Sequence, residues 1–184
     1  MTNRAALRWE LTGIAVIFLA GSVLHFVFDW TGHWRPIAWF AAVNESVWEH
    51  FKLAFWPGVL YAMVECLPLR RSVNNFWVGK GIGLFFMPVV VAVLFYGYTA
   101  VLGHHHIAVD ILIFFLAVGI GQWVSYRILA AADMGTAVRR GAMVGLVVMA
   151  AVFALFSYWP PRAFLFEDSR THQYGIPAGP CALR

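Results

Sequence analysis

The chain has 184 residues, of which 61% are hydrophobic and only 12% are charged, and its formal net charge is +4. A soluble domain is nearer half apolar and a quarter charged, so this composition excludes an ordinary water-soluble domain. One crossing of a bilayer takes about 20 apolar residues, so the chain has room for about five membrane helices and no separate soluble domain. The basic residues stand between apolar runs, where they orient a membrane protein. We therefore expect membrane lipid, and not nucleic acid, as the partner.

The first apolar run covers residues 9–30 and follows Arg4 and Arg8. A signal peptide has a similar basic start, but its apolar region is only about 7–15 residues long and ends at small residues. This run is longer and ends in Phe-Asp-Trp, so we expect an uncleaved first helix. The next apolar piece, PIAWFAAV, is too short to span. It is expected to form a short re-entrant or interfacial helix before the second span.

Four further apolar runs complete an all-α bundle. We predict transmembrane helices over about residues 9–30, 46–67, 75–102, 106–130 and 137–158. The Trp-Pro-Pro sequence that follows ends the last helix. The bundle then takes residues 1–161, and a polar, ordered tail takes residues 162–184. Asp168, His172 and Tyr174 of this tail would form a lid if it folds back over the bundle. The exposed aromatic faces of such a bundle would also allow a homo-oligomer.

Lys and Arg residues are unevenly divided between the two sets of connections. One set has eight, namely Arg4, Arg8, Arg70, Arg71, Lys80, Arg127, Arg139 and Arg140. The other set has four, namely Arg35, Arg162, Arg170 and Arg184. Because positive residues stay on the cytoplasmic side, we predict that the N-terminus is inside and the C-terminus outside. On this topology all seven histidines lie at or near the outer face.

The sequence NESVWEH, residues 44–50, precedes and begins the second predicted helix. Ser46 and Glu49 match a capping box, in which the Ser hydroxyl accepts a bond from the Glu N–H and the Glu carboxylate returns to the Ser N–H. A helix that begins inside a bundle must satisfy its first N–H groups there, because lipid offers no partners. The polar stretch is thus open to a purely structural interpretation, as a helix cap.

Polar residues on three predicted helices indicate a site near the outer face. A spacing of four residues, which places two side chains on one helix face, joins Glu45 to Glu49, His25 to Asp29 and His106 to Asp110. Ionisable groups within spans face the bundle interior or water and are candidates for function. Imidazole and carboxylate together suit Zn²⁺ or another transition metal. The predicted metal ligands are His25, Asp29, His50, His106 and Asp110.

A catalytic zinc has three protein ligands and an open position for a water, whose pKa it lowers to about 7. In a hydrolase of this kind the water attacks the carbonyl of a lipid or amide substrate, Glu49 or Glu45 acts as general base, and Ser46 or Lys52 stabilises the oxyanion. Lys52 is also open to a second interpretation, as the counter-ion of Glu45, Glu49 or Asp110. Two non-enzymatic alternatives stay open: a pocket for a metal ion, lipid headgroup or partner helix, and polar groups that only lock the bundle.

Four stretches, HFVFDW, AVNESVWEHFKLAFWP, VDILIF and FEDSRTHQYGI, resemble an uncharacterised family of bacterial multi-pass membrane proteins, a domain of unknown function. The resemblance covers most of the chain and implies the fold, the polar signature and a bacterial inner membrane, but no reaction. The His104–His106 run is not part of that signature, which favours NESVWEH and Asp110. By spacing alone, Ser46 and His50 are similar to the S-x-x-x-H pattern of alkaline-ceramidase-like membrane hydrolases, which implies an intramembrane zinc site. That superfamily has seven spans and a late H-x-x-x-H helix, which this chain lacks.

Overall fold

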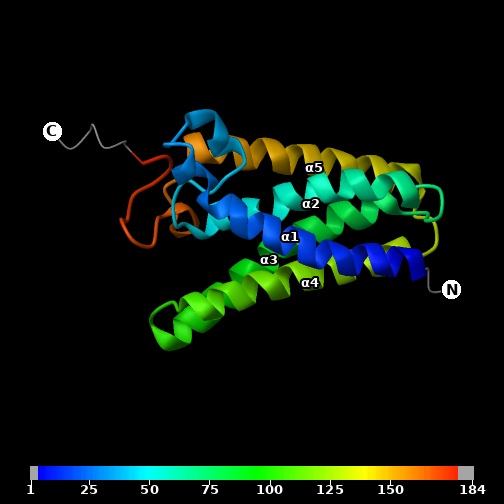
Figure 1. Cartoon of the computed structure of the whole chain (residues 1–184), viewed down its shortest axis with the longest axis horizontal. Coiled ribbons are helices and arrows are strands. Elements are labelled where there is room, and N and C mark those ends of the chain that lie inside the picture. Colours follow the sequence, from blue (N-terminus) through cyan, green and yellow to red (C-terminus); the bar gives the residue numbers. More distant parts are fainter. Residues whose placement is uncertain (1–3, 178–184) are drawn as a thin grey trace.

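The computed structural model describes residues 4–177, and this part of the chain is built from helices. Its five long helices follow the long axis of the molecule (Figure 1). They are α1 (Arg4–Trp30), α2 (Val47–Leu69), α3 (Phe76–Leu102), α4 (Ile107–Leu129) and α5 (Gly135–Tyr158). The predicted spans match these bounds within a few residues, except that α1 begins at Arg4 rather than at residue 9. The short helix expected before the second span is the 3-10 helix η1 (Arg35–Trp39), and a second one, η2 (Phe164–Phe166), lies in the tail.

Four of these helices, α1, α3, α4 and α5, are long and apolar enough to cross a membrane. Their outward faces carry large exposed hydrophobic side chains, for example Leu19 and Val101. Such faces suit lipid and not water, and they indicate an integral membrane protein. Helix α2 is not among these four; it contains Glu49, Lys52 and Glu65, and all three side chains are buried inside the bundle.

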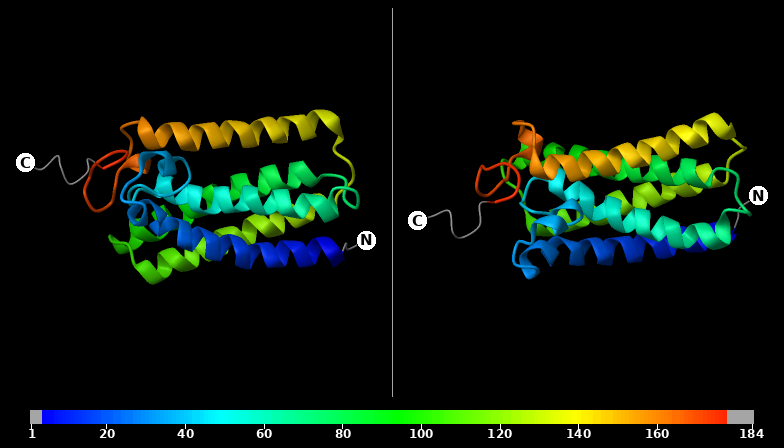
Figure 2. Two further views of the ribbon diagram at one scale, coloured as in Figure 1. Left: turned by 45° about the horizontal axis from the view of Figure 1, so that its top comes forward. Right: turned by 90° about the horizontal axis from the view of Figure 1, so that it is seen from above.

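Successive helices run in opposite directions, so their connections gather at two ends of the molecule (Figure 2). We call one the tail end: it holds the connections 31–46 and 103–106 and the described tail, 159–177. The other, the N-terminal end, holds the start of α1 and the turns 70–75 and 130–134. Helix α1 packs against α2 and α4, and α3 packs against α2, α4 and α5. The α1–α2 connection and the tail therefore meet at the same end.

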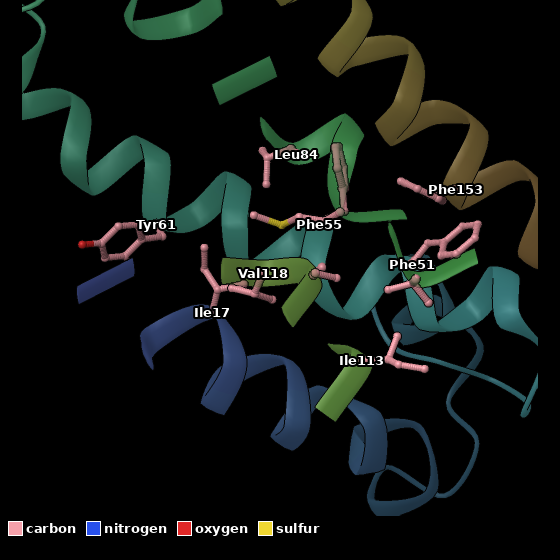
Figure 3. Close-up of a cluster of buried hydrophobic side chains, with 12 residues drawn as sticks. Ile17, Phe51, Phe55, Tyr61, Leu84, Ile113, Val118 and Phe153 are labelled. Carbon is pink, nitrogen blue, oxygen red and sulfur yellow. The ribbon is translucent and has the colours of Figure 1, made fainter. Parts of the chain in front are cut away.

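An apolar cluster occupies the middle of the bundle and draws on all five long helices (Figure 3). Its large members include Ile17, Phe51, Phe55, Leu84, Val118 and Phe153. Lipid is as apolar as this core, so close packing rather than the hydrophobic effect holds such helices together. Helices α3 and α4 approach closely at two glycines: a Cβ on Gly83 would lie 2.6 Å from the carbonyl oxygen of Gly121. Only glycine fits there.

The position of Lys80 differs from the one assumed when the basic residues of the connections were counted. It was counted among the connections, but it lies in α3 with 2% of its surface exposed, and its Nζ is 2.7 Å from Glu10 Oε1 and 2.5 Å from Glu65 Oε2. The remaining basic residues at the N-terminal end are Arg4, Arg8, Arg70, Arg71, Arg127, Arg139 and Arg140. Those of the tail end are Arg35, Arg162 and Arg170, while Arg184 lies outside the described residues. The N-terminal end still has more basic residues than the tail end, and the orientation stays a prediction.

Candidate functional site

Three of the predicted site residues meet at the tail end. His25 comes from the last part of α1, Glu45 from the connection before α2, and His50 from the first turn of α2. Glu45 Oε2 lies 3.6 Å from Nε2 of both histidines, and one ligand atom of each residue lies within 4.8 Å of the other two. Atoms that share one tetrahedral zinc at about 2.0–2.1 Å are about 3.4 Å apart. The cluster therefore needs only a small adjustment to hold a metal ion.

A backbone contact fixes the orientation of the His50 ring. Its Nδ1 lies 2.8 Å from the carbonyl oxygen of Ser46, one turn earlier. A carbonyl only accepts hydrogen bonds, so Nδ1 carries the hydrogen and Nε2 is left with a lone pair. That nitrogen is the one nearest to Glu45. Metal-bound histidines are commonly held in this way, by a second partner on the other ring nitrogen.

The cluster is half-buried and can reach water. The side chains of His25, Glu45 and His50 are 29%, 31% and 32% exposed. Contact with His25, supported by the charge of His50 and to a smaller extent by that of Arg170, holds the pKa of Glu45 below its usual range, although burial opposes this. Glu45 is therefore a carboxylate at neutral pH, which is the form that binds metal.

The tail folds back onto the connection that carries Glu45. Asp168 Oδ2 accepts a hydrogen bond of 3.0 Å from the Glu45 N–H, and the Ser169 hydroxyl donates to the Glu45 carbonyl at 3.2 Å. Arg170 Nη1 lies 3.6 Å from Glu45 Oε1, and the Asn44 amide donates to the carbonyl of Gly175. Of the three expected lid residues, only Asp168 makes such a contact, since His172 and Tyr174 both bond Glu167.

Glu49 and Lys52, the predicted base and oxyanion contact, belong to a separate buried network. Their side chains are 2% and 0% exposed, and Lys52 Nζ lies 2.6 Å from Glu49 Oε2. The same ammonium donates to the Ala38 carbonyl at 2.8 Å and to the Ser157 hydroxyl at 2.7 Å. The Ser157 hydroxyl in turn donates to Glu49 Oε1, and the Val43 N–H donates to Glu49 Oε2. Lys52 is thus the counter-ion of Glu49, and the pair ties η1, α2 and α5 together.

The capping box is half confirmed. The Ser46 hydroxyl accepts a bond of 3.4 Å from the Glu49 N–H, as predicted. The predicted return bond from the Ser46 N–H to the Glu49 carboxylate is not formed. The Ser46 N–H donates instead to Asn44 Oδ1 at 2.9 Å, because the Glu49 carboxylate is occupied by Lys52 and Val43. Ser46, 1% exposed, therefore caps the helix from inside the fold.

The other predicted ligands have different partners. Asp29 pairs with His33 at 3.1 Å on an exposed surface. Asp110 accepts a hydrogen bond from the Tyr98 hydroxyl and lies 3.1 Å from His105 Nδ1, while the His106 N–H donates to the Tyr98 oxygen. These side chains do not join the His25–Glu45–His50 cluster. Sequence reasoning missed Arg170, because a tail residue gives no local signal of its distant partner.

No curated protein and no solved structure matches this chain. The spacing similarity to ceramidase-like hydrolases has no structural support either, since Ser46 caps α2 and bonds His50 only through its carbonyl. One family model does match, and it covers residues 1–176, nearly the whole chain. The protein belongs to this family, which is described as a family of unknown function (DUF6512).

Proposed function

We propose that this protein is a five-span membrane protein that binds a zinc ion, or a similar transition metal, through His25, Glu45 and His50. The observation that supports the proposal is the single Glu45 oxygen placed 3.6 Å from two imidazole nitrogens. Two histidines and one glutamate are a ligand set of catalytic zinc sites, where the fourth position stays open to water. The half-exposed side chains allow such a water.

The proposed setting is a bacterial inner membrane with the tail end outside. The excess of arginine at the N-terminal end supports this orientation. Helix α2 is the fifth span in this proposal: it is 23 residues long, and its charged side chains are paired inside the bundle, away from lipid. The proposed metal site then lies where the outer surface of the inner membrane meets water. The ester and amide linkages of lipids are found at this level.

The proposed activity is metal-dependent hydrolysis of a lipid ester or lipid amide. A zinc ion with three protein ligands lowers the pKa of a bound water to about 7. A water with that pKa is substantially deprotonated at neutral pH, so no dedicated base is needed, and Glu49 need not supply one. Arg170, whose side chain is 72% exposed beside Glu45, is positioned to contact an anionic headgroup or a developing oxyanion. Glu45 acts here as a ligand and not as a base.

A specific observation favours one second candidate, a metal-free ion-pair lock. Arg170 already pairs with Glu45, and Asp168 and Ser169 hold the Glu45 backbone. In that case the cluster serves to dock the tail on the bundle, and Glu45 is neutralised by arginine and histidine. The two candidates differ in whether metal binds and in what Glu45 does for the tail.

Zinc binding by the detergent-purified full chain separates them. We expect about one equivalent of zinc in the unaltered protein, by elemental analysis after dialysis and by calorimetry. Glu45→Gln and His50→Ala should lose it, because each removes one of three ligands. His104→Ala is the matched control: this histidine is exposed at the same end and bonds only the Leu102 carbonyl. Equal zinc in all four proteins would overturn the assignment of the ligands.

Activity is tested on the zinc-loaded protein with a lipid ester and a lipid amide in mixed micelles. Turnover that a chelator and Glu45→Gln both abolish, and that His104→Ala keeps, supports the hydrolase. Zinc binding without turnover of either lipid leaves a metal-binding membrane protein and rejects that activity. If no zinc binds and Glu45→Gln frees the tail to a protease, the ion-pair lock is the function of the cluster.

A further inference from the structure

A second buried ionic cluster lies at the N-terminal end of the bundle, at the other end of the helices from the His25–Glu45–His50 cluster. Lys80 of α3 lies between Glu10 of α1, at 2.7 Å, and Glu65 of α2, at 2.5 Å. Ser125 of α4 donates a hydrogen bond of 2.7 Å to Glu10 Oε1. The side chains of the three charged residues are 0–3% exposed. Four helices thus enclose two carboxyl groups and one ammonium group.

The charges of this cluster do not balance. Two carboxylates and one ammonium leave one negative charge without a partner in a site closed to water. The hydrogen bonds do not balance either: Glu10 Oε2 and both oxygens of Glu65 are buried and make no hydrogen bond. Glu65 Oε2 still has the ammonium of Lys80 beside it, whereas Glu65 Oε1 has no partner. Leaving a buried charge unpaired is so costly that such a group normally takes up a proton instead.

Within residues 4–177, no neighbouring group removes the imbalance. The hydroxyl of Tyr61, the other titratable group of α2 here, donates to the Trp9 carbonyl at 2.6 Å. On α4 the packed polar groups are the neutral Ser125 and Gln122, and the Gln122 amide donates to the Glu10 carbonyl. The one cation that α3 contributes is Lys80. For the described residues, this imbalance points to a bound ion as the compensating charge.

We propose that Glu10 and Glu65 bind one exchangeable proton between them, which makes the cluster with Lys80 neutral. A proton fits better than a metal ion for two reasons. A metal ion would lie next to the Lys80 ammonium and would need several further oxygen ligands. The surroundings are also packed too tightly for an ion with ligands, since a Cβ on Gly13 would lie 2.1 Å from Gln122 Nε2. A proton needs no cavity.

The proposed proton-binding site lies in the N-terminal half of the bundle and is independent of the zinc site. Two carboxyl groups this close titrate as a pair, so the proton belongs to both residues together. Paired carboxyl groups inside membrane bundles are the chemical basis of proton relays. The ligand of the site is thus a proton delivered from water at the N-terminal end, where α1 and α3 begin.

Infrared spectroscopy of the full chain in lipid nanodiscs tests the proposal. With ¹³C-labelled glutamate at neutral pH, we expect the carbonyl band of a protonated glutamic acid, equal to about one carboxyl group per chain. Glu65→Gln and Glu10→Gln should each remove it, because the remaining carboxylate then pairs with Lys80. Asp110→Asn, which changes a carboxyl at the other end, should leave the band unchanged.

The absence of this band from the unaltered protein at neutral pH would overturn the proposal, and so would a band of full intensity in both glutamine variants. If a variant does not fold, the presence or absence of the band in the ¹³C spectrum of the unaltered chain is enough to support or overturn the proposal. Thermal unfolding gives a second readout. Glu65→Gln replaces a neutral acid by a neutral amide of the same shape and should keep the melting temperature, whereas Lys80→Met leaves a carboxylate with no cation and should lower it.

Discussion

Lys52 is a charged residue that an apolar bundle accommodates because each of its hydrogens has a partner. An ammonium has three donors, and those of Lys52 go to Glu49, the Ala38 carbonyl and Ser157. The pair with Glu49 is therefore balanced in charge and in hydrogen bonds. Removing one partner of a buried pair leaves the other charge uncompensated, which costs about 3–5 kcal/mol.

Lys52→Met is accordingly expected to lower the free energy of unfolding by about 3–5 kcal/mol, because Glu49 is left as a buried carboxylate without a cation. The double variant Lys52→Met/Glu49→Gln should recover much of that loss, since neither charge remains. Denaturant unfolding in detergent, followed by tryptophan fluorescence, measures both. Arg139→Met is the control, because Arg139 and Asp133 form an exposed pair worth less than about 1 kcal/mol. A Lys52→Met loss no larger than that of the control would contradict this role.

At this scale the sequence predicts which residues are polar and near the tail end, but not which of them meet. The four-residue spacing joined His25 to Asp29, yet Asp29 pairs with His33 and His25 reaches Glu45 in the next connection. Spacing along one helix reports a shared face and carries no information on a partner from another segment. Lys80 was misplaced for the same reason: its two carboxylate partners come from helices far away in the chain.

The long helices are the elements that the sequence predicts well. An apolar run of about 20 residues between turn residues leaves few alternatives in lipid, where each backbone group must bond within its own helix. The tail is different, because its structure depends on contacts between distant residues such as Asp168 with Glu45 and Asn44 with Gly175. Its fold could not be derived from local patterns, although its polarity and its order were expected.

The tail is expected to undock in Asp168→Asn. Burial raises the pKa of Asp168, but bonds from the N–H groups of Glu45, Thr171 and Arg170 outweigh it and hold the pKa below its usual range. A lowered carboxyl pKa stabilises the docked tail above the ordinary value of about 4, and this stabilisation is lost as the pH falls through the lower, folded value. An asparagine has one acceptor oxygen where the aspartate has two, so it behaves at neutral pH as the acidified protein does.

Hydrogen exchange of the Glu45 amide and tryptic cleavage after Arg170 measure the docking. Both should be faster in Asp168→Asn than in the unaltered protein at neutral pH. In the unaltered protein, the protection of the Glu45 amide relative to its intrinsic exchange rate should fall only below about pH 4. Glu167→Gln is the matched control, because Glu167 is the neighbouring carboxylate and bonds His172 and Tyr174 within the tail itself. Unchanged exchange at Glu45 in Asp168→Asn would show that Asp168 does not hold the two segments together.

Two of the polar clusters of the molecule lie at opposite ends, with the apolar core cluster between them. The cluster of His25, Glu45 and His50 is half-exposed at the tail end, whereas that of Glu10, Glu65 and Lys80 is closed at the N-terminal end. Helix α2 contributes to both and carries residues of the central apolar cluster between them. These charged residues distinguish α2 from the four helices that are apolar enough to span by composition. Which cluster faces which compartment depends on the orientation.

Reporter fusions in a bacterial cell determine that orientation and the number of spans together. A fluorescent protein fused to the N-terminus should fluoresce, and alkaline phosphatase fused to the C-terminus should be active, because an odd number of spans separates the two termini. A phosphatase fusion after Arg71, in the turn between α2 and α3, should be inactive if α2 crosses the membrane. Activity after Arg71 together with an inactive C-terminal fusion and no N-terminal fluorescence would reverse the orientation and place His25, Glu45 and His50 in the cytoplasm. The same two phosphatase results with N-terminal fluorescence retained would reduce the count to an even number of spans and remove α2, the helix with three buried charges, as a crossing.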